Sequence, residues 1–184
     1  MTLASLLFIA AALQASPRSA IEKQYQRLDS VILRNDVPGM LAIQALSFSS
    51  VSPNGQAYDY AAMEERTRLM ASLIDSVIYA RNTIREFASR PDTVVVMVCQ
   101  EYSRMQRLGD GRPHRLDTSA LQRERWVLSG TEWRRERVDD VHGLRWFVDS
   151  VRVDPSRRID PSRPSTPAPP FKPDPDPPTG CGRL

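Results

Sequence analysis

The segment Arg125-Trp-Val-Leu-Ser-Gly-Thr-Glu-Trp-Arg134 carries the strongest structural signal in this chain, because it places a tryptophan in each arm of a predicted β-hairpin. Ser129-Gly130 offers a two-residue turn whose twist matches that of paired strands. This turn would create four cross-strand pairs of compatible chemistry: Trp126 with Trp133, Glu124 with Arg135, Arg123 with Glu136, and Leu121 with Val138. A four-residue loop is the alternative, and it would set Arg125 against Glu136 and Glu124 against Arg137.

Residues 1–15 contain no charged side chain and hold an apolar run that is too short to span a bilayer as a mature helix. This pattern predicts a signal peptide that is cleaved after Leu13-Gln14-Ala15. An uncleaved N-terminal anchor is the alternative. We therefore expect an exported protein, periplasmic or secreted, with no membrane segment after cleavage.

The charge pattern argues against a nucleic-acid-binding protein, although the net charge is +3 and the pI is about 9.1. The basic residues alternate with acids, as in Arg-Glu-Arg at 123–125 and Arg-Arg-Glu-Arg at 134–137. Such interleaving is typical of a solvated strand surface with salt bridges. No nucleic-acid partner is expected.

Hydrophobic periodicity predicts three N-terminal helices followed by a sheet. A capping box at 19–22 precedes apolar residues at helical spacing, Asp36 can cap a second short helix, and a third helix covers 63–74 with Glu64 and Glu65 in its first turn. A strand pattern occurs at 46–52, between the second and third helices. Further strand patterns follow at 77–87, 92–107 and 144–153, besides the hairpin. This order predicts an α+β fold in which helices pack on one face of a long, curled antiparallel sheet.

The chain divides into a globular domain at 16–153 and a proline-rich tail at 154–184. Ten of the last 31 residues are proline, and Asp-Pro-Ser-Arg occurs at 154–157 and again at 160–163. Such a segment cannot build its own core, so we expect it to be disordered or docked on the domain surface.

Cys99 lies in an apolar strand and Cys181 lies near the end of the tail. An even number of cysteines in an exported protein allows a disulfide. We favour a buried, small apolar Cys99 and a loose Cys181, because pairing would require the tail to fold back onto the sheet.

The order of elements, the break at Asn35-Asp36, the turn Ser52-Pro-Asn-Gly55 and the spacing of Trp126 and Trp133 resemble the nuclear-transport-factor-2-like superfamily. The closest part of it is the exported SnoaL-like group, which includes ketosteroid-isomerase-like domains. The resemblance covers about residues 19–150. It implies a cystatin-like cone. In such a cone, a curved sheet wraps around a long helix and leaves an apolar pocket open at one end. It also implies a homodimer, since relatives often pair through the outer sheet face.

The ketosteroid isomerases of this superfamily carry a base and an oxyanion donor that this chain lacks. Their general-base aspartate precedes the Pro-x-Gly turn, where this chain has Ser52. Their donor tyrosine lies on the first helix at the position of Leu28. Proton transfer between carbon atoms needs both groups. Tyr25, one turn earlier, is expected to pack with its hydroxyl at the pocket rim.

Glu101 is the strongest catalytic candidate, because a carboxylate that faces a pocket can act as a base. It shares strand parity with Val95, Met97 and Cys99, so pairing with an arginine is the alternative. His114 and His142 lack a ligand cluster, and we expect surface residues and no metal site. No cofactor motif is present in the sequence.

Five aromatic residues fall on elements that frame the cone and could line a ligand pocket or fill the core: Tyr25, Phe48, Tyr79, Tyr102 and Trp126. We therefore predict an exported, non-enzymatic module that binds a small apolar molecule or a protein. The first alternative is an isomerase, cyclase or dehydratase acting on a small apolar substrate. The second alternative is a dimerising scaffold with a filled cone, in which the tail is the functional part.

Overall fold

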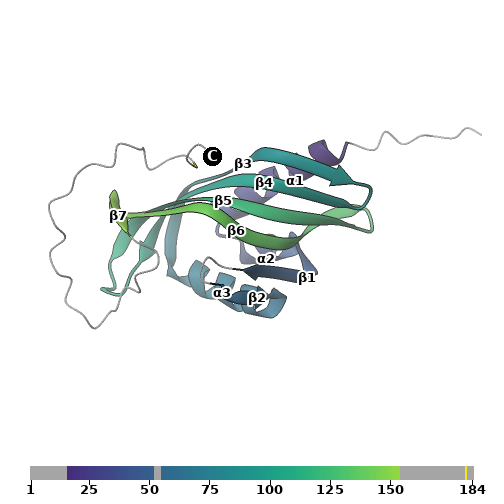
Figure 1. Ribbon diagram of the computed structural model, residues 1–184. Helices are drawn as coiled ribbons and strands as arrows, with labels where there is room; N and C mark the ends of the chain where they lie inside the picture. The colour runs from purple at the N-terminus through teal and green to yellow at the C-terminus, as the bar shows by residue number, and fades with distance from the viewer. Residues whose placement is uncertain (1–15, 52–54, 154–180, 182–184) are drawn as a thin grey trace, which may run out of the picture.

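The computed structural model describes residues 16–51, 55–153 and 181; the signal-peptide prediction, the turn before Gly55 and almost the whole tail lie outside these residues. The helices are α1 (Pro17–Leu33), α2 (Val37–Ala42) and α3 (Tyr60–Leu73). The strands are β1 (Gln44–Val51), β2 (Ala57–Asp59), β3 (Ile74–Arg90), β4 (Thr93–Arg107), β5 (Pro113–Ser129), β6 (Glu132–Val148) and β7 (Val151–Val153). Figure 1 shows the long strands β3, β4, β5 and β6 side by side, with α1 behind them and α2, α3, β1 and β2 below β6.

The sheet is curved and unclosed, with the order β2-β1-β6-β5-β4-β3 in the described part of the chain and β7 paired to β6. All pairs are antiparallel except β1 with β6, which run parallel. The predicted α+β cone is therefore confirmed, with a mixed rather than a purely antiparallel sheet. The parallel strand is β1, which lies between α2 and β2 in the chain and joins the edge of β6 that β5 leaves open.

The tryptophan hairpin is confirmed, but the first of its two predicted registers is wrong. Residues 126–129 follow the offset of the alternative, and a shift follows between Arg125 and Trp126. Ser129 pairs with Glu132, so the turn consists of Gly130 and Thr131, and Trp126 lies opposite Arg135 instead of Trp133. Gly130 has a φ of 63°. Primed hairpin turns need a positive φ at their first central residue, and this register gives that position to the glycine.

The helix ends follow local capping chemistry. Ser16, not Ser19, caps α1, because Pro17 fits the first helical position and the Ser16 hydroxyl accepts from the Ser19 amide at 3.3 Å. Asp36 caps α2 as predicted, accepting from the Gly39 amide at 3.0 Å. Asp59 caps α3. That helix begins earlier than expected, so its two glutamates at 64–65 lie beyond the first turn.

The hydrophobic core lies between one face of α1 and the inner face of the sheet. Ile21, Tyr25, Leu28 and Val31 of α1 pack against the even-numbered valines of β4, at 94, 96 and 98. Both tryptophans of the hairpin are buried in the same cluster. Side chains alternate between the two faces of a strand, so even-numbered residues of β4 face inward and odd-numbered ones face outward. This parity decides which residues reach the interior.

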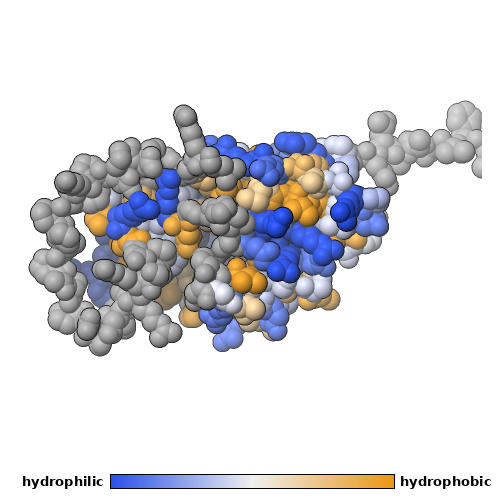
Figure 2. Space-filling view, viewed as in Figure 1, coloured by the Kyte–Doolittle hydropathy of each residue, from blue (hydrophilic) through white to orange (hydrophobic). Residues whose placement is uncertain are grey.

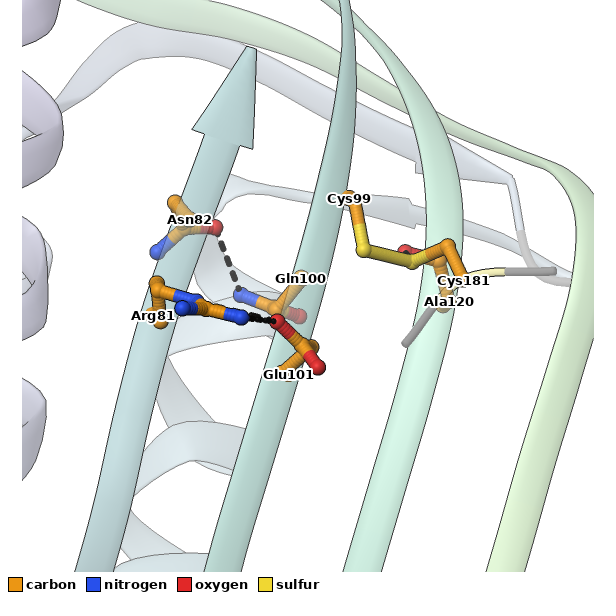
Figure 3. Close-up of a disulfide and its surroundings, with 7 residues drawn as sticks. All are labelled: Arg81, Asn82, Cys99, Gln100, Glu101, Ala120 and Cys181. Atoms are coloured by element: carbon orange, nitrogen blue, oxygen red, sulfur yellow. Dashed lines mark hydrogen bonds and ion pairs between the residues drawn. A yellow bond between two sulfur atoms is a disulfide. The ribbon is translucent and has the colours of Figure 1, made fainter. Parts of the chain in front are cut away.

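Cys99 and Cys181 form a disulfide, so the predicted loose Cys181 is wrong. Figure 3 shows the bond extending from β4 toward β5, where the Cys181 sulfur contacts the carbonyl of Ala120 at 3.1 Å. Cys99 has outward parity and no exposed surface. The pairing joins positions 82 residues apart, a relation that no local sequence pattern encodes.

Charged residues are interleaved on the strands as predicted. Arg125 pairs with Glu136 at 3.2 Å across the hairpin, and Arg137 pairs with Asp139 at 3.0 Å along β6. Figure 2 shows a hydrophobic area over β4 and β5 that is bordered by hydrophilic residues. Among the described residues, no helix has the length and apolar character needed to cross a membrane.

Candidate ligand-binding site

A cavity of about 500 Å³ lies in the cone, beyond the end of the packed core. Its lining residues come from the three helices and from β1 to β6. Its apolar lining includes Ile32, Met40, Phe48, Met63, Met70, Val138, Leu144 and Trp146. Three of the six methionines of the chain are in this wall. Methionine side chains adapt to irregular shapes, so the wall suits an apolar molecule.

The polar lining is rich in cations and amides. Three arginines contribute, Arg66 from α3, Arg104 from β4 and Arg135 from β6, together with the side chains of Asn82, Gln100, Gln122 and Thr118. Arg66 donates to the Tyr58 hydroxyl at 2.8 Å. Guanidinium and amide groups bind and orient ligands, but they do not accept a proton at neutral pH. The wall is therefore equipped for binding.

Arg104 is buried in this wall, with 4% of its surface exposed. Its Nε donates to Gln106 Oε1 at 2.6 Å, and its guanidinium lies 4.5 Å from the centre of the Tyr102 ring. Burial lowers the pKa of Arg104, because desolvation penalises the charged form. Burial likewise raises the pKa of Tyr102, whereas Arg104 lowers it.

Arg135, by contrast, is neutralised by a buried carboxylate. Its Nη1 donates to Glu124 Oε1 at 2.8 Å and its Nε donates to Gln44 at 3.0 Å. Glu124 Oε2 accepts from the Tyr25 hydroxyl at 2.7 Å and from the Trp126 indole at 3.2 Å. Burial, and then the Glu124 carboxylate, raise the pKa of Tyr25 well above its ordinary value. This buried cluster joins α1 to the hairpin.

Comparison with known proteins gives no family model that matches the sequence and no significantly similar curated protein. Solved structures do match. An NTF2-like protein from Cytophaga hutchinsonii has a TM-score of 0.56 at 18% identity, covering 68% of this chain and 97% of its own. A conserved protein from Planctomyces limnophilus has a TM-score of 0.58 at 11% identity, covering 71% and 96%. This chain has the nuclear-transport-factor-2-like fold.

A third match is a protein from Novosphingobium aromaticivorans that is provisionally named as a scytalone dehydratase. Its TM-score is 0.58 at 14% identity, and the match covers 71% of this chain and 83% of the other. At these identities the shared nuclear-transport-factor-2-like fold is established, and the activity is not.

The five aromatic candidates occupy three different places in the nuclear-transport-factor-2-like cone. Phe48 and Tyr102 line the cavity. Tyr25 and Trp126 are in the core, with ring centres 5.2 Å apart in an edge-on arrangement. Tyr79 stacks under Arg81, 5.6 Å from its guanidinium, and does not contribute to the cavity wall. Burial, and then the negative charge of Glu101, raise the pKa of Tyr79.

Glu101 is among the lining residues, but its odd position on β4 turns its side chain outward, where it has an arginine partner, the alternative that the sequence left open. Its Oε2 accepts from both Nε and Nη2 of Arg81, at 3.0 and 2.7 Å (Figure 3). The hydrogen bonds to Glu101, and then the negative charge of Glu101, raise the pKa of Arg81. Glu101 Oε1 is buried without a hydrogen-bond partner among the described residues. A carboxylate that an arginine neutralises is a poor base.

By the resemblance to ketosteroid isomerases, Ser52 and Leu28 stand where those enzymes have their general base and their oxyanion donor. Leu28 is in the core, with 2% of its surface exposed, and Ser52 lies outside the described residues. His114 bonds Asp149 at 2.6 Å and Asp110 at 2.9 Å and is absent from the cavity lining. His142 is in β6. The described residues contain no cluster of three or more metal-binding side chains.

Arg104 is the cavity residue that the sequence reasoning missed. Its signal was present, because Arg104 shares the parity of Val94, Val96 and Val98, the buried face of β4. An arginine on the inward face of an apolar strand is unusual, since charged side chains are almost never fully buried unless they are paired.

Proposed function

We propose that this protein binds a small, largely apolar molecule in the cone cavity and does not transform it. The observation that carries the proposal is the composition of a cavity of about 500 Å³, whose size is within the usual range for ligand pockets. Its lining combines methionines and aromatic rings with arginines and amides. Glu101 is the sole acidic residue in this lining among the described residues, and its odd position on β4 puts its carboxylate on the outward face, where it pairs with Arg81.

The cavity favours ligand binding over a scaffold with a filled cone. A ligand in this cavity would remove apolar side chains such as Met40, Met63 and Trp146 from water, which contributes favourable free energy. A protein-binding role through the outer surface does not require such a space.

A substitution that fills the cavity tests the proposal. Ala120 is buried on β5 and lines the cavity, so Ala120→Phe should occupy part of it. Ala88 on β3 is exposed and absent from the lining, which makes Ala88→Phe the matched control. The neutral dye N-phenyl-1-naphthylamine becomes fluorescent in apolar surroundings. We expect saturable dye uptake by the native chain and Ala88→Phe, and a loss of uptake by Ala120→Phe with unchanged circular dichroism.

Uptake of the dye by Ala120→Phe with native affinity would contradict the proposal, as would the absence of uptake by the native chain. Native mass spectrometry of the purified protein adds an independent measurement. We expect a retained small molecule, and we expect the mass of a homodimer, which stays a prediction.

A dehydratase-like or isomerase-like enzyme is the second candidate. The specific observation in its favour is that some structures with this fold are provisionally named as dehydratases. Such a reaction needs a base at the substrate. Glu101 is the candidate base, so turnover that Glu101→Gln abolishes would establish the enzyme and refute the binding proposal.

Export from the cytoplasm is part of the proposal, and the disulfide between Cys99 and Cys181 supports it. Disulfides persist in oxidising compartments and are rare in the cytosol. Fractionation of cells that express the full chain should place the protein outside the cytoplasm, with a mass that lacks residues 1–15.

A further inference from the structure

We propose that Arg104 binds a carboxylate group of the ligand, so that the cavity takes a small acid with an apolar body. This inference rests on the proposed binding function and names its ligand class. It starts from the position of Arg104, which is buried on the inward face of β4 and lines the cavity.

Arg104 has no acidic partner among the described residues. Its recorded contacts are the Gln106 side chain and the face of the Tyr102 ring. A glutamine oxygen and a π face accept part of the charge but do not neutralise it. A buried guanidinium without a carboxylate is costly, and an anion that binds it offsets part of this cost.

Arg135 provides an internal comparison. It lines the same cavity, and the fold supplies Glu124 at 2.8 Å to pair with it. Both arginines are held in place by a glutamine side chain. The difference between them is that Arg135 has a carboxylate partner inside the protein, whereas Arg104 has none among the described residues.

Arg66 extends the positive field from the opposite wall. It lines the cavity from α3, contacts the ring and the hydroxyl of Tyr58, and has no recorded carboxylate partner among the described residues. Arg66 is exposed to solvent, so it adds a screened charge to that of the buried Arg104. A cavity with low-dielectric walls concentrates this field and favours an anion.

The rest of the lining narrows the anion to a carboxylate. Guanidinium binds a planar carboxylate through two parallel hydrogen bonds. The lining also includes Met40, Met63, Met70 and Trp146, which suit the apolar body of an acid better than a strongly hydrated phosphate group. These side chains would contact the apolar body of the acid. The expected ligands are aliphatic or aromatic monocarboxylic acids.

Matched acids and amides test the assignment by isothermal titration calorimetry on the full purified chain. The probes are 4-phenylbutanoate, decanoate and 2-naphthoate, each paired with its primary amide. We expect at least one acid to bind about tenfold or more tightly than its amide, since a charged hydrogen-bonded pair contributes that much. Arg104→Gln should abolish this preference without weakening the amide, and Arg104→Lys should retain part of it.

Arg85→Gln is the matched control, because Arg85 is exposed on β3 and absent from the cavity lining. Uptake of the neutral dye by Arg104→Gln shows that the variant is folded with its cavity intact. Equal affinity of acid and amide for the native chain in all three pairs would overturn the carboxylate assignment, as would an undiminished preference in Arg104→Gln. If the carboxylate assignment fails but the native chain still takes up the dye, the proposed binding function stands. If the native chain binds neither the dye nor any of the acids, both proposals are overturned.

Discussion

The hydroxyl of Tyr25 on α1 donates a 2.7 Å hydrogen bond to the carboxylate of Glu124 on β5, and the two residues are 99 positions apart in the chain. The same carboxylate binds Trp126 and Arg135. Glu124 is fully buried, so each of these bonds replaces water that the carboxylate has lost. The cluster holds the first helix against the hairpin.

Tyr25→Phe should destabilise the protein, because the variant keeps the ring and removes one donor from a buried carboxylate. We expect a loss of about 1–3 kcal/mol in the free energy of unfolding. Urea denaturation followed by tryptophan fluorescence measures it. Tyr102→Phe is a suitable control for removal of a hydroxyl that makes no recorded side-chain hydrogen bond. Equal stability of native protein and Tyr25→Phe would contradict the role of this bond.

Glu124→Gln should be more harmful, because it leaves the mostly buried Arg135 without its counter-charge. The expected loss is about 3–5 kcal/mol, typical of a buried pair that loses one partner. Glu136→Gln is the matched control. Its pair with Arg125 is half exposed, so the loss should stay below about 1 kcal/mol. Similar urea midpoints for the two variants would show that burial of the pair has little effect.

Cys181→Ala should lower stability by about 4 kcal/mol, the chain-entropy value for a disulfide that closes a loop of this length. The loop spans 82 residues, so the bond strongly restricts the unfolded chain. Urea denaturation of oxidised protein, reduced protein and the variant measures the effect, and the last two should agree. Two free thiols in the unfolded, unreduced protein would refute the disulfide.

Gly39→Ala should be destabilising, although alanine normally stabilises a helix interior relative to glycine. A Cβ at position 39 would lie 2.5 Å from Asp36 Oδ2 and 2.6 Å from Val31 Cγ1. The substitution therefore displaces the helix cap or the core valine, at a cost of about 1–3 kcal/mol. Thermal unfolding should show a lower midpoint. A raised midpoint would mean that neither contact constrains α2.

The pKa of His114 should lie above its ordinary value of 6.5, because the hydrogen bonds that its ring donates to Asp149 and then to Asp110 favour the charged ring. Its stabilising contribution is complete below about pH 6.5 and is lost as the pH rises through the folded pKa. The pKa values of both aspartates are lowered, chiefly by the hydrogen bond to His114. Their contribution is present above about pH 4 and is lost in acid.

NMR titration of the His114 ring in the native chain and in Asp149→Asn tests this expectation. The variant removes the largest contribution, so its His114 pKa should fall toward 6.5. An unchanged titration curve in Asp149→Asn would contradict the pairing of the two side chains.

Local patterns predicted the elements well. Apolar spacing located α1 and the long strands, and Asp36 was correctly expected to begin α2. The hairpin was also expected. These features depend on residues that are close in sequence, where steric and capping preferences act directly.

Register and partners were harder to predict. The Glu124 and Arg135 pair was expected and exists, but across a shifted register with a bulge at 125–126. Of the five aromatic candidates, Phe48 and Tyr102 line the cavity, and the structure places the others elsewhere. Long side chains reach diagonal neighbours, so the chemistry of a pair does not specify one register.

The sequence by itself determined the order of helices and strands, the hairpin and the alternation that turns one face of β4 inward. Tertiary structure alone decided that β1 joins β6 in parallel, that Cys181 reaches Cys99, and that Arg135 obtains a carboxylate while Arg104 does not. Periodicity is a property of neighbouring residues, which share one backbone geometry. Partnership between distant residues depends on how the sheet curves and packs, which is a property of the whole chain.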